Sequence, residues 1–142
     1  MTGAAVPDPR AARASRLILA TGAMVMALAT ICGALGAHTL PDRLSPAQLD
    51  IYDTAVRFQF FQALGLLVLG AVVRGGYSEG LNAAAVLLVA GIVLFCGSLY
   101  LLAFRITLGA PLIVGLTTPL GGILLIGGWL MFAITSWRSR RA

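Results

Sequence analysis

The chain has 142 residues, of which 59% are hydrophobic and only 11% are charged, and its formal net charge is +5. A soluble domain of this size exposes much of its surface and needs more charge than this to cover it. Disordered chains are excluded as well, because disorder requires low hydrophobicity. The composition therefore predicts an integral membrane protein made of one domain.

The first span is expected at Leu17–Ala37, an uncharged stretch that as a helix covers about 31 Å, the thickness of the hydrocarbon core. Arginines before it and small residues near its end also fit a secretory signal peptide. The stretch is longer than the usual core of such a peptide, so a retained span is favoured. Residues 1–16 are then a short cytoplasmic N-terminal tail.

The longest polar stretch is His38–Arg57. Within it, Ser45 and Gln48 have the spacing of a capping box at a helix start. Apolar residues follow at helical spacing among acidic ones, which predicts a short amphipathic interfacial helix between the first and second spans. Asp53 and Arg57 lie one helical turn apart and are expected to form an interfacial ion pair.

Three further apolar stretches follow, at Phe58–Val73, Leu81–Phe104 and Leu112–Ser136. The last is interrupted at Thr118-Pro119. Either Pro119 lies inside one long kinked helix, or a new helix begins there with Thr118 as its cap. The predicted fold is an all-α, membrane-embedded bundle of four transmembrane helices over residues 17–137, followed by a basic cytoplasmic tail at 138–142.

The arginines indicate an orientation. With four spans both termini share one side, and that side carries seven of the ten basic residues: Arg10, Arg13, Arg16, Arg74, Arg138, Arg140 and Arg141. Only Arg43, Arg57 and Arg105 lie on the other side. The positive-inside rule then predicts that both termini are cytoplasmic. We interpret these arginines as topology signals and lipid contacts, and no nucleic-acid partner is expected.

No charged residue lies in the middle of any predicted span, so the titratable groups that mark ion or proton pathways are missing there. Cys32 and Cys96 lie in apolar runs without metal-ligand spacing. We predict no catalytic, cofactor-binding or metal-binding residues. Gln59 and Gln62 share a helix face; they either line a small polar cavity or form interhelical hydrogen bonds.

His38 is the single histidine and follows the first span. A nearby carboxylate, Asp42, Asp50 or Asp53, is a candidate partner for it. Such a pair can sense pH or transfer a proton. The alternative interpretation is a structural contact without chemistry.

Several sequence blocks occur together in one known family. They are Gly33-Ala34-Leu35-Gly36-Ala37-His38, Leu44-Ser45-Pro46, Tyr52, Thr54-Ala55-Val56-Arg57-Phe58-Gln59, Gly97-Ser98-Leu99-Tyr100 and Thr118-Pro119-Leu120-Gly121-Gly122. In this order they resemble the YgdD/transmembrane-protein-256 family, small multi-pass membrane proteins with a domain of unknown function. The resemblance covers Leu17 to Trp137 and implies a bacterial inner-membrane protein of about four helices. It implies no reaction.

One position departs from the family pattern. Members typically resemble Gln-x-x-His-Ala-Leu where this chain has Gln59-Phe60-Phe61-Gln62-Ala63-Leu64, so the resemblance carries no titratable group to Gln62. The blocks also contain most polar residues near the outward ends of the spans. We hypothesise one polar cluster there, formed by His38, Ser45, Arg57, Gln59, Gln62, Ser98, Tyr100 and Thr118.

Three functions fit the sequence. The leading one is a non-enzymatic membrane protein without a cofactor, which acts by assembling with itself or with other membrane proteins in the lipid bilayer. The alternative is a small-solute or ion pathway, for which Gln59 and Gln62 offer the polar groups. A membrane enzyme that uses His38 with a neighbouring carboxylate is the third.

Overall fold

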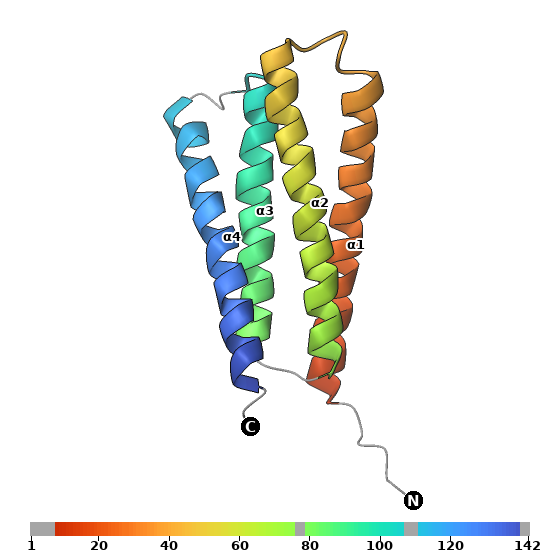
Figure 1. The fold of residues 1–142 in the computed structure, drawn as a ribbon, viewed down its shortest axis with the longest axis vertical. Coiled ribbons are helices and arrows are strands. Elements are labelled where there is room, and N and C mark those ends of the chain that lie inside the picture. The colour runs from red at the N-terminus through yellow and green to blue at the C-terminus, as the bar shows by residue number, and fades with distance from the viewer. Residues whose placement is uncertain (1–7, 76–78, 107–110, 140–142) are drawn as a thin grey trace, which may run out of the picture.

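A computed structural model of the chain describes residues 8–75, 79–106 and 111–139. Its helices are α1 (Pro9–His38), α2 (Pro46–Gly75), α3 (Glu79–Ala103) and α4 (Pro111–Ser139). Successive helices run in opposite directions, and both termini lie at the same end of the bundle (Figure 1). All four are long and apolar enough to cross a membrane, which confirms the four predicted spans. We call the end with both chain termini the terminal end and the opposite one the loop end.

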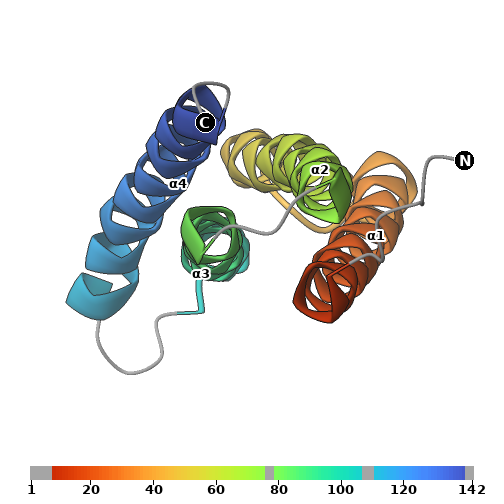
Figure 2. The same cartoon turned by 90° about the horizontal axis from the view of Figure 1, so that it is seen from below.

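The four helices do not close into a square. The main packing pairs are α1 with α2, α2 with α3, and α3 with α4, so α2 and α3 are central and α1 and α4 lie outside (Figure 2). Half of the apolar stretch of α2 is buried inside the protein, against 17% for α1 and 17% for α4. The two outer helices therefore leave most of their apolar surface to the membrane.

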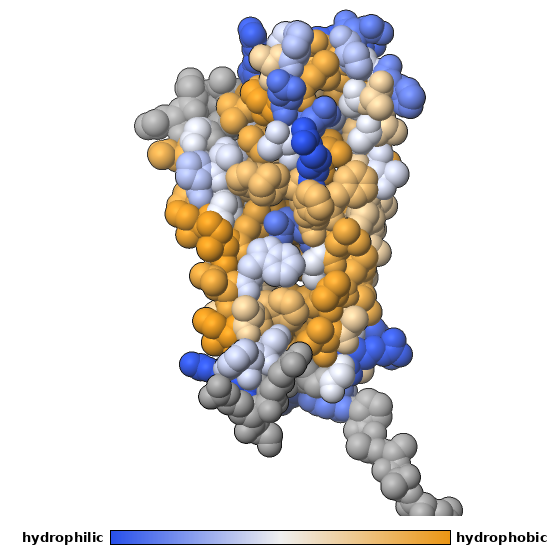
Figure 3. Space-filling model, viewed as in Figure 1, coloured by the Kyte–Doolittle hydropathy of each residue, from blue (hydrophilic) through white to orange (hydrophobic). Residues whose placement is uncertain are grey.

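The surface repeats the division of the sequence into apolar spans and polar ends. On the face shown in Figure 3, the middle of the bundle is mostly apolar and hydrophilic side chains gather at both ends. Among the described residues, the terminal end carries five arginines against Asp8 and Glu79. The loop end carries three arginines, at positions 43, 57 and 105, against three aspartates, at positions 42, 50 and 53. The excess of positive charge lies at the terminal end.

Helix α1 begins before its apolar stretch does. The carboxylate of Asp8 accepts a hydrogen bond from the backbone N–H of Arg10 at 2.9 Å, and Pro9 occupies the first turn, where its missing N–H costs nothing. The C-terminal half of the predicted tail is therefore helical. The buried hydroxyl of Ser15 donates to the carbonyl of Gly70 at 2.8 Å, which fastens this extension to α2.

The predicted separate interfacial helix does not occur in the described part of the chain. The Ser45–Gln48 capping box forms as expected, with the Ser45 backbone N–H donating to Gln48 Oε1 at 3.1 Å. The helix that it starts then continues to Gly75 without interruption. No glycine or proline separates the amphipathic turns from the apolar stretch, so the backbone hydrogen bonds propagate through both.

Helix α4 is continuous through Pro119, so the alternative in which a new helix starts there is wrong. Proline removes one backbone hydrogen bond and crowds the preceding turn. The residue four positions earlier is Gly115, whose missing side chain lies in open space. Thr118 is not a cap but a member of the helix, and its hydroxyl pairs with α3 as described below.

Helix α3 ends in a left-handed turn at the loop end. Arg105 has φ = 57°, its N–H donates to the carbonyl of Leu102 at 3.0 Å, and the N–H of Ile106 donates to that of Leu101 at 2.8 Å. These two bonds are those of a Schellman motif, in which glycine is the usual residue at this position. Gln48 at the start of α2 also donates from Nε2 to the carbonyl of Ala103 at 2.7 Å, so the start of α2 helps to cap the end of α3.

Glycines set the close approach of α3 to α4. A Cβ added to Gly91 would lie 2.7 Å from Leu125 Cδ2, and one on Gly128 would lie 2.9 Å from Leu88 Cδ2. A Cβ on Gly121 would overlap the backbone of Phe95, with 2.8 Å to its Cα. Small residues that let backbones approach are the usual means of helix association in membranes. The main apolar core continues from here to α2, around the fully buried Leu66, Leu69 and Leu88.

Candidate functional site

The candidate site is the set of polar side chains between the helices. Four polar side chains are buried among the described residues, namely Ser15, Gln59, Gln62 and Ser98. A polar group in an apolar interior costs free energy unless it is hydrogen-bonded. Each of these side chains has a hydrogen-bond partner on another helix.

Gln59 joins three helices. From α2 its Nε2 donates to the carbonyl of Val25 in α1 at 3.2 Å, and its Oε1 accepts from the hydroxyl of Tyr100 in α3 at 2.7 Å. The ring of Tyr100 meets that of Tyr52 edge-on with 5.1 Å between centroids. Tyr52 in turn donates its hydroxyl to the carbonyl of Cys32 in α1 at 2.8 Å. We call Tyr52, Gln59 and Tyr100 the polar junction.

The sequence places the junction residues on one face. Tyr52, Gln59 and the buried Val56 and Ala63 recur at intervals of three and four along α2, which keeps them on the side that meets α1 and α3. Gly36 makes room for Tyr52, because a Cβ there would lie 3.0 Å from the Tyr52 ring. The junction packs against the smaller apolar core of the loop end, around Leu40 and Ala103.

Gln62 points to the other outer helix. Its Oε1 accepts a hydrogen bond from the indole N–H of Trp129 in α4 at 2.9 Å. The Trp129 ring reaches α2 because Gly65 has no side chain, and a Cβ there would lie 2.5 Å from the ring. The two glutamines lie three positions apart on α2, as the spacing predicts, but they bond to different helices. Gln59 bonds to α1 and α3, and Gln62 bonds to α4.

Ser98 and Thr118 pair across α3 and α4, with 2.7 Å between their hydroxyl oxygens. Ser98 also lies 2.9 Å from the carbonyl of Phe95, one turn back in its own helix. Because Thr118 precedes Pro119, this pair holds α3 against the part of α4 that lacks a backbone hydrogen bond. Both residues are members of the hypothesised polar cluster, and the structure brings these two together.

The remaining residues of the hypothesised cluster lie apart from these pairs. His38, Ser45 and Arg57 are exposed at the loop end, and Ser45 bonds to its own capping partner, Gln48. The structure therefore brings together Gln59 with Tyr100 and Ser98 with Thr118, and it places Gln62 with Trp129. It does not gather all eight residues at one point.

The expected Asp53–Arg57 ion pair is not formed between these two described residues. Both side chains are exposed, and the carboxylate of Asp53 turns toward α1, where it would meet a Cβ on Gly36 at 3.5 Å. An exposed pair of this kind gains little free energy from contact and is easily solvated. His38 likewise forms no hydrogen bond or ion pair with the three candidate aspartates, all of which lie in the described part of the chain.

Four contributors to the site were not foreseen as such: Ser15, Tyr52, Trp129 and the carbonyl groups of α1. Trp129 lies more than sixty positions from Gln62 in the sequence, so no local pattern links the two. Backbone carbonyls leave no trace in a sequence. Cys32 and Cys96 are both free thiols. No cluster of three or more potential metal ligands occurs among the residues the structure describes.

The comparison with known proteins identifies a family. A family model described as a protein of unknown function (DUF423) matches residues 32–122. The chain belongs to this family. The DUF423 segment contains all eight residues of the hypothesised cluster, together with Tyr52 of the polar junction, whereas Val25 and Trp129 lie outside it. The expectation of a small multi-pass membrane-protein family without an assigned function is confirmed.

Relatives of the DUF423 chain are bacterial membrane proteins by name. A UPF0382 membrane protein of Staphylococcus haemolyticus is 39% identical over 123 residues, which is 87% of this chain and 97% of the relative. One from Staphylococcus epidermidis is 41% identical over 85% of this chain and 95% of its own length. YwdK of Bacillus subtilis is 34% identical over 85% and 96%. No solved structure matches the chain.

Proposed function

We propose that this DUF423 member is a non-enzymatic protein of the bacterial inner (plasma) membrane that acts by assembling with itself or with other membrane proteins. Within the family we place it with the YgdD/transmembrane-protein-256 proteins, as its sequence blocks suggest. The observation that carries the proposal is the state of the buried polar groups. Each of the four in the described residues is bonded to another helix.

Polar groups that are engaged in this way stabilise the bundle and are not presented to a substrate. A hydrogen bond between membrane helices contributes about 0.6–2 kcal/mol. Gln59 has both ends of its amide occupied, so a solute that passed it would have to replace two hydrogen bonds. This supports a structural use of the glutamines over a polar pathway.

The uncovered face of α4 supports assembly. Leu116, Leu120, Ile123, Leu130 and Ile134 are all more than half exposed, and Gly127 lies between them with open space where its Cβ would be. These six positions alternate in steps of four and three. That spacing of 3.5 residues keeps a stripe facing a second, nearly parallel or antiparallel helix.

The charge distribution supports an orientation. The described terminal end carries five arginines against two acidic residues, whereas the loop end is balanced. Positive residues near spans remain on the cytoplasmic side. We therefore propose that both termini are cytoplasmic, which predicts that a reporter active only outside the cytoplasm stays inactive when fused after Ala142.

The assembly proposal is tested by crosslinking in native membranes. In a chain with Cys32→Ala and Cys96→Ala, Ile123→Cys places a thiol on the α4 stripe. Val93→Cys, 65% exposed on α3, is the matched control. Oxidation should give a dimer band, or a band with another membrane protein, at Ile123 and not at Val93. Equal crosslinking at both positions, or none at Ile123, contradicts assembly through α4.

The two alternative functions, a solute pathway and an enzyme, can each be tested by a separate measurement. A small-solute pathway predicts that proteoliposomes swell in glycerol or urea and that Gln62→Leu abolishes the swelling. An enzyme that uses His38 predicts turnover that is lost in His38→Ala. We expect no swelling above that of empty vesicles, and we expect His38→Ala to retain the crosslinks at Ile123.

A further inference from the structure

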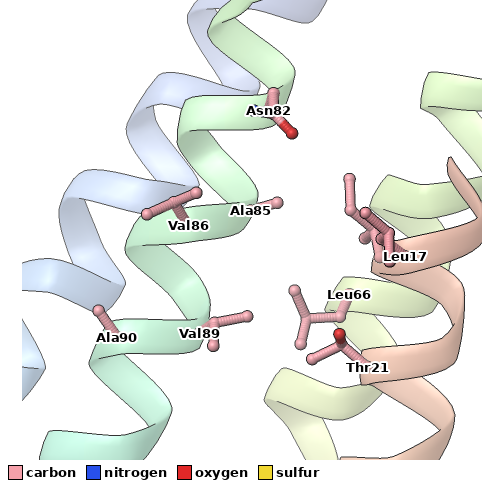
Figure 4. A pocket seen from close by; sticks show the side chains of 9 residues that line it. Leu17, Thr21, Leu66, Asn82, Ala85, Val86, Val89 and Ala90 are labelled. Atoms are coloured by element: carbon pink, nitrogen blue, oxygen red, sulfur yellow. The ribbon is translucent and has the colours of Figure 1, made fainter. Parts of the chain in front are cut away.

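A groove separates the two helices that flank α2 at the terminal end. Helices α1 and α3 both pack on α2 but hardly on one another, and the space between them is a hollow of about 400 Å³. Figure 4 shows Leu17 and Thr21 of α1 facing Ala85 and Val89 of α3, with Leu66 of α2 as the floor. The volume lies within the range of about 300–1,000 Å³ typical of ligand sites.

The lining of the groove is suited to a hydrocarbon chain. Its nine lining residues are apolar except for Thr21 and Asn82, and Asn82 lies one turn into α3, near the end of the bundle. Leu17 is 61% exposed and Val86 is 61% exposed, so the groove opens sideways to the bilayer rather than into the protein. The groove is therefore apolar along its length, and its polar lining residue Asn82 lies toward the terminal end.

Positive charge lies at the polar end of this groove. Leu17 also borders a second hollow on α1, whose other lining residues are Pro9, Ala12, Arg13 and Arg16. Both arginines are exposed. A guanidinium group offers paired N–H donors that match a phosphate, and arginines at the end of a span lie at the depth of lipid headgroups.

The acidic residues of this end leave the arginines available. Glu79, at the start of α3, and Asp8 are the two acidic residues of the described terminal end, and Asp8 is occupied in capping α1. No salt bridge joins Arg13 or Arg16 to a carboxylate within the described residues. The α1 side of the groove mouth thus carries two positive charges, against the single negative charge of Glu79 on the α3 side.

We propose that the α1–α3 groove is a binding site for one anionic phospholipid of the adjacent leaflet. One acyl chain lies between Leu17 of α1 and Val86 and Val89 of α3, and the headgroup phosphate is held by Arg13 and Arg16. The site differs from ordinary lipid contact because Leu17 borders both the apolar groove and the hollow lined by Arg13 and Arg16. It is also separate from the α4 stripe, which lies on another side of the bundle.

Native mass spectrometry of the full chain in detergent tests the site, with phosphatidylglycerol and phosphatidylcholine of identical acyl chains as probes. We expect one phosphatidylglycerol to bind with a clear preference. Arg13→Gln with Arg16→Gln should weaken it about 30-fold, equivalent to about 2 kcal/mol for two arginines near a membrane surface. Arg74→Gln with Arg138→Gln, which changes the same charge at the same end, is the control and should weaken it little.

A second pair of variants tests the acyl-chain part of the site. Ala90→Phe fills the groove and should reduce the binding of both lipids, whereas Val93→Phe, one turn further along α3 and outside the groove, should not. Thermal unfolding in the same detergent verifies that each variant is folded. Equal binding of the two lipids, an equal effect of the two arginine pairs, or occupation of the groove by a second copy of the chain would overturn the proposal.

Discussion

The α3–α4 interface and the polar junction hold helices together by different means. Between α3 and α4 the fit depends on missing atoms, because Gly91, Gly121 and Gly128 admit their neighbours where a Cβ would collide. At the junction, α2 holds α1 and α3 through atoms that are present, the amide of Gln59 and the hydroxyls of Tyr52 and Tyr100. The first interface is sensitive to added volume and the second to lost partners.

The largest effect is expected for Gly121→Leu at the glycine interface. The obstacle is the backbone of Phe95, which cannot move aside as a flexible side chain can, so the destabilisation should be on the order of 3 kcal/mol or more. Gly97→Leu on α3 is the control, because nothing lies within 4 Å of a Cβ there. Unfolding by a denaturing detergent should separate the two variants, and equal stability would refute the close approach.

Replacing Gln59 in the polar junction should lower the free energy of unfolding less than Gly121→Leu does. Gln59→Leu leaves the Tyr100 hydroxyl without its acceptor and removes the bond to Val25, at a cost of about 1–2 kcal/mol in the free energy of unfolding. Tyr100→Phe in the Gln59→Leu background should then cost less than in the natural chain. Strictly additive effects in this double-mutant cycle would show that the two side chains are not coupled.

Trp129 takes part in both kinds of contact, since it packs over Gly65 and donates to Gln62. Trp129→Phe should lower the free energy of unfolding less than Gln59→Leu does. Phenylalanine retains an aromatic ring over Gly65 but cannot donate to Gln62, so the loss should be about 0.6–1 kcal/mol. Trp129→Ala removes the ring as well and should cost more, since it empties the space beside Gly65. If the two variants were equally stable, packing at this glycine would contribute nothing.

The smallest expected effect is an increase in stability, for Arg105→Gly at the end of α3. Arg105 adopts φ = 57°, which glycine reaches without the steric cost that an L side chain has there. The relief of about 1–2 kcal/mol of left-handed strain exceeds the cost of about 0.4–1 kcal/mol that arises because glycine adds entropy to the unfolded chain. Arg105→Gly should therefore raise the free energy of unfolding by about 0.5–1 kcal/mol, without changing the effect of either Gly121→Leu or Gln59→Leu. If Arg105→Gly were less stable than the natural chain, the arginine side chain would itself stabilise the fold by more than the backbone strain costs.

The spans could be predicted because each one is a long apolar run between charges, a signal that needs no tertiary information. Boundaries set by local hydrogen bonds were harder. The Asp8-Pro9 cap starts α1 well before its apolar residues, and hydropathy does not register a cap. The amphipathic turns after Ser45 were recognised, but a helix without a breaker has no reason to end where its polarity changes.

The site residues were predictable in kind but not in pairing. Polar side chains within apolar runs are few, so Gln59, Gln62, Ser98 and Thr118 are conspicuous in the sequence. Their partners depend on which helices are neighbours and on glycines such as Gly65 that let a distant ring approach. The Asp53–Arg57 pair shows the opposite error: ideal spacing on a helix does not form a contact when both groups are solvated.

The early start of α1 has a mechanical consequence. At about 1.5 Å per residue the 30-residue helix is about 45 Å long, whereas a hydrocarbon core is about 30 Å thick. The part of α1 that extends beyond the hydrocarbon core continues the same helix without a break. Ser15 in this part is hydrogen-bonded to α2. Arg13 and Arg16 therefore cannot adjust to the membrane surface independently of the span. A thicker or thinner bilayer has to tilt or shift α1 as one rigid rod and strain its contact with α2, so bilayer thickness is coupled to helix packing.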